Sequence, residues 1–76
     1  MIKSVDIKDL LDARPFKPFR IHLSDGSHYD VSTHDHAMVA SRIVEVGMDP
    51  DNEGFPQKLV RCTIGHITRI EELQAA

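Results

Sequence analysis

The segment from Phe19 to Val31 constrains the fold most, because only one pairing of its two halves separates apolar from polar side chains. A two-residue turn at Asp25-Gly26 would mix both kinds on each face. A three-residue loop over residues 24–26, with Gly26 at positive φ in a bulge, separates them. That register pairs Phe19 with Val31, Arg20 with Asp30, Ile21 with Tyr29 and His22 with His28. The sequence therefore predicts a half-buried antiparallel hairpin.

A short helix is expected before this hairpin, over residues 4–14. Ser4 is a suitable N-cap, and Asp6 lies in the first turn, where the helix dipole favours a carboxylate. Pro15 ends the segment. Its apolar stripe consists of Ile7, Leu10 and Leu11. Because so short a helix is unstable alone in water, we expect it to pack across one end of the sheet structure.

The chain after the hairpin contains further strands. Residues 32–35 indicate a turn, and two apolar runs between residues 37 and 48 then flank Ser41-Arg42. Neither serine nor arginine favours the positive φ that a tight hairpin turn needs. We therefore expect one long strand bent by a bulge at residues 41–42, with a hairpin as the alternative.

The second half of the chain begins with residues 49–56, which are rich in turn-forming residues and predict a loop. Its acidic start resembles a calcium-binding loop, but Val60 occupies the position of the bidentate glutamate, so a solvated loop is expected. Residues 58–64 predict a strand whose inward side chains are Val60, Cys62 and Ile64. This alternation makes Cys62 a core thiol.

Gly65-His66 ends that strand. The three-residue spacing of Ile67 and Ile70 predicts a tight helical turn before a last short strand at residues 67–71. Residues 74–76 are expected to be a frayed end. The elements together predict one mainly β domain over residues 1–76, with strands between about residues 18 and 73 that form a small, strongly bent antiparallel barrel.

Composition excludes several classes of protein. With 9 basic and 12 acidic side chains the net charge is −3, which argues against sequence-independent binding of duplex DNA. No apolar run is long enough for a membrane span, and the start of the chain lacks a signal-peptide pattern. A single cysteine excludes an internal disulfide and suits a reducing compartment. We therefore expect a cytoplasmic protein.

Catalytic motifs are absent, so the sequence predicts neither an enzyme nor a bound cofactor. The histidines are the candidate metal ligands. His34 and His36 would share one face of a strand, and His22 and His28 would face each other across the hairpin. We expect solvated histidines, with a metal site at these four residues as the alternative.

The strand at residues 58–64 lies near the end of the expected strand order. An edge strand carries unpaired backbone groups that can pair with another copy of the chain. The candidate assembly edge consists of Lys58, Val60, Cys62 and Ile64. The alternative is an edge protected by Lys58, Arg61 and Pro56.

The order of a terminal helix, a hairpin with Asp-Gly, a bent apolar strand and a last strand after Gly-His resembles the Sm-like (LSm) family. Asp35 and Met38 match its first motif, in which Val39 replaces an asparagine; in the second motif His66 is retained. The resemblance implies a small Sm/SH3-like barrel, rings joined through edge strands, and binding of uridine-rich RNA. Residues 14–26 also resemble small bacterial proteins of unassigned function.

These observations lead to one main expectation and two alternatives. We expect a non-enzymatic barrel that acts as a homo-oligomeric assembly or protein-interaction module. The first alternative is a ring that binds single-stranded RNA through His66, Arg61 and Lys58. The second is a histidine-based metal-binding protein.

Overall fold

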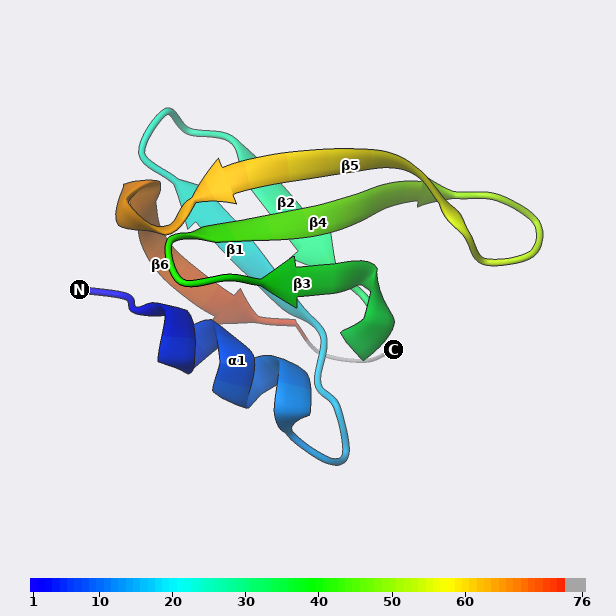
Figure 1. Cartoon of the computed structure of the whole chain (residues 1–76), viewed down its shortest axis with the longest axis horizontal. Coiled ribbons are helices and arrows are strands. Elements are labelled where there is room, and N and C mark those ends of the chain that lie inside the picture. Colours follow the sequence, from blue (N-terminus) through cyan, green and yellow to red (C-terminus); the bar gives the residue numbers. More distant parts are fainter. Residues whose placement is uncertain (74–76) are drawn as a thin grey trace.

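The computed structural model describes residues 1–73, which form one short helix and six strands (Figure 1). The mainly β class is therefore confirmed. The elements are α1 Ser4–Asp12, β1 Phe19–Leu23, β2 His28–Val31, η1 His34–His36, β3 Ala37–Val39, β4 Ile43–Pro50, β5 Pro56–Thr63, η2 Ile64–His66 and β6 Ile67–Glu72. They make two antiparallel three-stranded sheets, in the orders β2-β1-β6 and β3-β4-β5. No helix among residues 1–73 is long and apolar enough to cross a membrane.

The β1–β2 hairpin has the register that the sequence predicts, with Ile21 opposite Tyr29 and Arg20 opposite Asp30. The loop over residues 24–26 is confirmed. The Leu23 amide donates to the Ser27 carbonyl at 2.9 Å, and the Gly26 amide donates to the Leu23 carbonyl at 3.0 Å. Gly26 has a φ of 89°, the bulge conformation for which glycine is suited.

The β3–β4 segment differs from the prediction of one bent strand. Ala37 lies opposite Val46, so residues 41–42 form the turn of a hairpin. Neither turn residue has a positive φ. Bonds from distant segments hold the turn instead: the Ser4 hydroxyl donates to the Ser41 carbonyl, and the Ile64 amide donates to the Arg42 carbonyl at 3.0 Å. The long-strand prediction is wrong because these contacts replace local turn chemistry.

Several predicted boundaries shift by a few residues. The helix ends at Asp12 rather than at residue 14, with an extended Ala13 after it. Its N-cap is Lys3 rather than Ser4, and the Lys3 amide donates to the Asp6 carboxylate at 2.8 Å. The predicted tight turn before the last strand is confirmed as η2, which also includes Ile64. The prediction for residues 74–76 lies outside the described residues.

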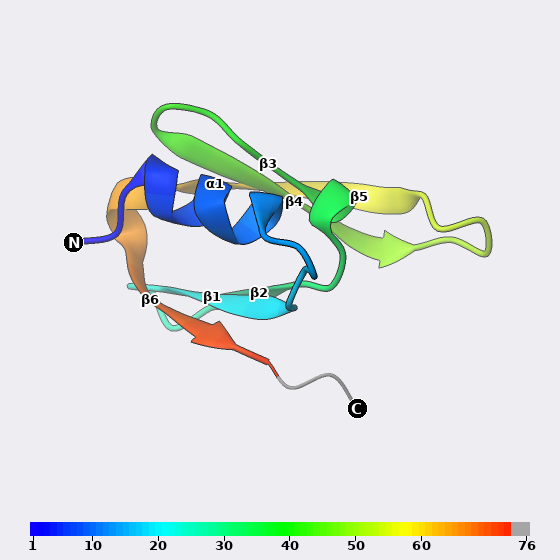
Figure 2. The same cartoon turned by 90° about the horizontal axis from the view of Figure 1, so that it is seen from below.

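The core lies where the two sheets and α1 meet. Seen from below in Figure 2, the sheets form two layers, and α1 lies across one side of them. The buried hydrophobic residues are Ile7, Leu11, Phe19, Ile21, Val31, Val44, Val46, Cys62, Ile64 and Ile67. The helix thus packs on the sheets through Ile7 and Leu11, as expected, along one side of the two layers. Within residues 1–73 each sheet has three strands, and strand pairing does not join one sheet to the other.

Candidate functional site

The strand β5 is one of the two edges of the second sheet, and β3 is the other. As the last strand in the order β3-β4-β5, β5 pairs with β4 alone among the described strands. The pairing runs along its whole length, from Pro56 to Thr63. An eight-residue edge of this kind presents a row of backbone groups to its surroundings.

The direction of the β5 peptide groups follows from one hydrogen bond. The Ile64 amide donates to the Arg42 carbonyl, and these two residues continue the β4–β5 register. Hydrogen-bonded and non-hydrogen-bonded pairs alternate along an antiparallel ladder. Val60 and Cys62 are therefore bonded to β4. The N–H and C=O groups of Leu59 and Arg61 point away from β4, toward the free edge.

The outer face of the same sheet carries exposed apolar side chains. Met38 is 73% exposed and Leu59 is 68% exposed. On β4, which lies between the strands of Met38 and Leu59, the Glu45 carboxylate binds the Arg61 guanidinium, with Nη2 2.8 Å from Oε2. Beside this pair, Gly47 forms the floor of a shallow hollow that Met38 and Leu59 border. The free edge is thus continuous with a partly apolar surface.

A groove of about 270 Å³ separates β5 from the β1–β2 turn. Its lining is mainly polar and includes Asp25, Arg61, Cys62, Thr63 and His66. The Ser24 amide donates to the His66 carbonyl at 2.9 Å and ties the turn to η2. Hydrogen bonds from Ser27 lower the pKa of Asp25, so this groove contains a carboxylate at neutral pH.

The predicted assembly residues have different surroundings. Lys58 is exposed and lies 3.4 Å from Asp49. Val60 is half-buried, whereas Cys62 and Ile64 belong to the core, so their side chains do not reach the edge. Burial also raises the pKa of the Cys62 thiol, in keeping with the core role expected for it. Side chains alternate along a strand, so Val60 and Cys62 point inward. The surface at this edge is therefore formed by the β5 backbone and by the side chains of Leu59 and Arg61.

The three candidate RNA contacts are not all in one place. Arg61 and His66 line the groove beside the β1–β2 turn. Lys58 is not part of that lining and is paired with Asp49 instead. Arg61 is itself paired with Glu45, which reduces the positive charge available to a phosphate.

The four candidate metal ligands are not brought together. The rings of His22 and His28 lie 5.9 Å apart, as the hairpin register implies. His34 packs against the ring of Phe16, and His36 bonds the Gly54 carbonyl at 3.1 Å. These last two residues lie in η1 rather than on a strand. Within residues 1–73, no group of three or more histidine, cysteine or carboxylate side chains is arranged to hold a metal ion.

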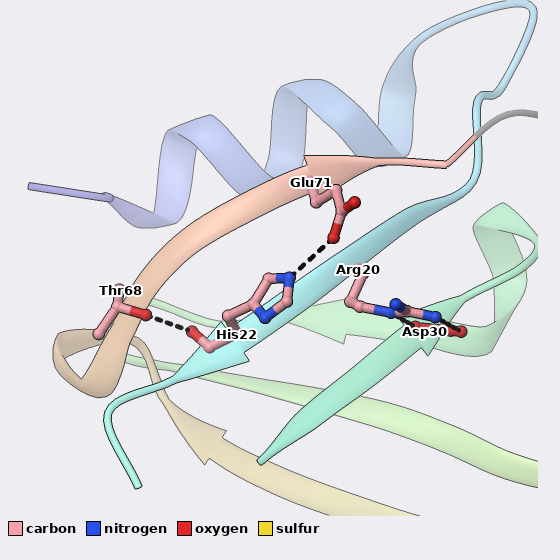
Figure 3. Close-up of polar contacts among 5 residues, drawn as sticks. All are labelled: Arg20, His22, Asp30, Thr68 and Glu71. Carbon is pink, nitrogen blue, oxygen red and sulfur yellow. Dashed lines mark hydrogen bonds and ion pairs between the residues drawn. The ribbon is translucent and has the colours of Figure 1, made fainter. Parts of the chain in front are cut away.

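A row of polar side chains covers the outer face of the first sheet (Figure 3). Arg20 makes two bonds to Asp30, of 2.6 and 3.1 Å, and His22 Nε2 lies 3.0 Å from Glu71 Oε1. The Thr68 hydroxyl donates to the His22 carbonyl at 3.3 Å. The bond to Arg20 lowers the pKa of Asp30, and the bond to His22 lowers that of Glu71. Sequence reasoning missed Glu71, because the pairing of β1 with β6 has no local signal.

The arrangement offers a backbone edge, an adjoining apolar face and a polar groove. The chain matches no protein-family model, and comparisons with curated proteins and with solved structures give no match either.

Proposed function

We propose that this chain is a non-enzymatic assembly module that self-associates through the free edge of β5. The observation that carries the proposal is the outward direction of the Leu59 and Arg61 peptide groups, which no strand in residues 1–73 pairs. Strand addition satisfies such groups with main-chain hydrogen bonds. The exposed Leu59 side chain adds apolar area at this edge, and the exposed Met38 on β3 adds to it across the outer face of the sheet.

We also propose that the two sheets are the halves of an open Sm/SH3-like barrel. The strand β2 leads directly through η1 into β3, and β5 leads through η2 into β6. If β2 and β3 are counted as one interrupted strand, the order β6-β1-β2/β3-β4-β5 is continuous. The bend of that strand would then lie at residues 32–36 rather than at 41–42. This order supports the Sm-like resemblance as a matter of architecture.

The assembly proposal is tested by removing one edge-facing N–H. In Leu59→Pro the amide that points away from β4 is lost, while the β4–β5 ladder keeps its own bonds. The matched control is Leu59→Ser, which removes the same exposed side chain and keeps the amide. Light scattering after gel filtration should show an oligomer for the wild type, an oligomer that forms at somewhat higher concentration for Leu59→Ser, and a folded monomer at all concentrations for Leu59→Pro. A wild-type protein that is monomeric at high concentration contradicts the proposal.

A second candidate is binding of single-stranded RNA in the groove beside β5. What favours it is that Arg61 and His66 line that groove together. The presence of Asp25 there and the pairing of Arg61 with Glu45 weigh against it. A fluorescence titration with oligouridine at low salt tests it, because phosphate contacts are strongest there. An absence of binding under these conditions eliminates the candidate.

A further inference from the structure

The edge of β5 restricts how a second copy can pair with it. The alternation along β5 makes Gln57, Leu59, Arg61 and Thr63 the residues whose peptide groups face outward. An antiparallel β5 of a second copy bonds through the same four residues of its own chain. Odd-numbered residues must therefore lie opposite odd-numbered residues. Three registers pair most of β5 with the β5 of the second copy. Their two-fold axes pass through Leu59, Val60 or Arg61.

These three registers are not equivalent. An axis at Arg61 places Gln57 opposite residue 65, which lies outside β5, and sets the two Arg61 guanidinium groups opposite each other. An axis at Leu59 places Thr63 opposite residue 55, which lies outside β5. An axis at Val60 places Leu59 opposite Arg61 and Gln57 opposite Thr63. This register alone uses every outward-facing residue of β5 without a like-charge pair.

The Val60-centred register also brings opposite charges together. It places Lys58 of one copy opposite Cys62 of the other. Lys58, Val60 and Cys62 share one face of β5, because side chains alternate along a strand. Cys62 lines the groove that also contains Asp25. The Lys58 ammonium of each copy is thereby directed to the Asp25 carboxylate of the other, and the two-fold axis makes this contact twice. Among residues 1–73, Lys58 pairs with Asp49, and this exposed pair is weak.

We infer that the partner of the β5 edge is a second copy of this chain, paired antiparallel about a two-fold axis at Val60, with Lys58 of each copy beside Asp25 of the other. The inference rests on the assembly function proposed above and adds to it the partner, the symmetry and the register. The result is a continuous six-stranded sheet, β3-β4-β5 followed by the same strands of the second copy in reverse order.

The charge contact is tested with variants that leave the fold intact. Lys58→Glu should weaken dimerisation by about tenfold or more in sedimentation equilibrium, because it faces the Asp25 carboxylate. Adding Asp25→Asn removes the repulsion and should restore most of the affinity. Asparagine keeps the side-chain oxygen that accepts from the Ser27 amide, so the turn is preserved. The control is Lys3→Glu, the same change of charge at the start of α1, which should leave dimerisation unchanged.

The register is tested by oxidative crosslinking. In a Cys62→Ala background, the single variant Val60→Cys should form a disulfide-linked dimer, because the Cβ atoms of a non-hydrogen-bonded pair lie at the short end of the cross-strand range, about 4.5 Å, which a disulfide can bridge. Leu59→Cys and Arg61→Cys, each alone in the same background, should not crosslink. Circular dichroism of each variant confirms that it is folded.

The outcomes separate this inference from the proposed function. Crosslinking at position 59 or 61 in place of 60, or a closed ring of more than two copies, overturns the inference and leaves edge assembly standing. Equal dimerisation of Lys58→Glu and the wild type also overturns it. A wild type that stays monomeric overturns both. Crosslinking at position 60 together with rescue of Lys58→Glu by Asp25→Asn supports the inference.

Discussion

Gly47 of β4 lies so close to Pro56 of β5 that a Cβ at position 47 would be 2.7 Å from both Cβ and Cγ of the proline ring. The same Cβ would lie 3.4 Å from the His36 carbonyl oxygen. The absence of a side chain at Gly47 therefore permits β4, β5 and η1 to pack closely where the outer face of the second sheet is hollowed. The requirement is one of space, because Gly47 has an ordinary negative φ.

We expect Gly47→Ala to destabilise the protein by about 1–3 kcal/mol, because a proline ring cannot rotate out of the contact. Urea unfolding followed by circular dichroism measures this change in the free energy of unfolding. Gly65→Ala is the control, since a Cβ at Gly65 has open space around it within the described part of the chain. Equal stability of the two variants would show that β4 and β5 can separate at this point without cost.

The helix α1 should contribute to stability through one face. Ile7 is fully buried, whereas Val5 on the same helix is 54% exposed. We expect Ile7→Ala to cost about 2–5 kcal/mol, because it leaves a cavity between α1 and the sheets. Val5→Ala should stay within about 0.5 kcal/mol of the wild type. Thermal unfolding of both variants checks this, and a small effect at Ile7 would mean that α1 is not docked in solution.

The β1–β2 turn depends on backbone conformation rather than on space. Gly26 has a φ of 89°, and no atom of residues 1–73 outside its chain neighbours lies within 4 Å of a Cβ built there. Gly26→Ala should therefore cost about 1–2 kcal/mol, the strain of an alanine in this region. Gly26→Asn should cost less, since asparagine tolerates positive φ. If alanine and asparagine behave alike in denaturant unfolding, the bulged loop is not the conformation in solution.

The Arg20–Asp30 pair should make stability depend on pH in the acid range. The bond to Arg20 lowers the folded-state pKa of Asp30 below its ordinary value of 3.8. The unfolded chain therefore takes up the proton first as the pH falls. The stabilisation is present above about pH 4 and is lost as the pH falls from there through the folded-state pKa. Because both side chains are partly exposed, the contribution is about 1 kcal/mol or less.

The measurement is urea unfolding of the wild type and Asp30→Asn at neutral pH and at about pH 3. The variant should be less stable at neutral pH, and the difference should shrink in acid. Asp9→Asn, which changes an exposed carboxylate of α1, is the control for general charge effects. A difference between Asp30→Asn and the wild type that is independent of pH would exclude an ionic contribution from this pair.

The sequence predicts the parts of this fold that local chemistry determines. The hairpin at residues 19–31 is correct to the residue, because Gly26 and the alternation of apolar side chains agree on one register. The tight turn before β6 is also present, as η2, but Ile67 and Ile70 both lie in β6, where a register shift opposite His22 and Leu23 accounts for their spacing. The β3–β4 hairpin is only the alternative prediction, because the contacts from Ser4 and Ile64 that stabilise its turn have no local signal.

The candidate site could be predicted only in outline. Alternating side chains locate β5 and its inward residues, but the order of the strands decides that β5 is an edge. The neighbours of β5 depend on contacts between segments far apart in the chain: Asp25 and His66 meet beside it because the Ser24 amide bonds the His66 carbonyl. Single-sequence patterns do not contain such contacts, so neither the groove nor the pairing of Arg61 with Glu45 could be foreseen.

Amide hydrogen exchange, followed residue by residue by NMR at low and high protein concentration, tests self-association at β5 most directly. The amides of Val60 and Cys62 bond β4 and should be protected at every concentration. Those of Leu59 and Arg61 face the free edge, so their protection should appear only as the concentration rises and the second copy pairs with β5. If Leu59 and Arg61 exchange freely at all concentrations while Val60 and Cys62 remain protected, β5 is a bare edge and the proposed assembly function is wrong.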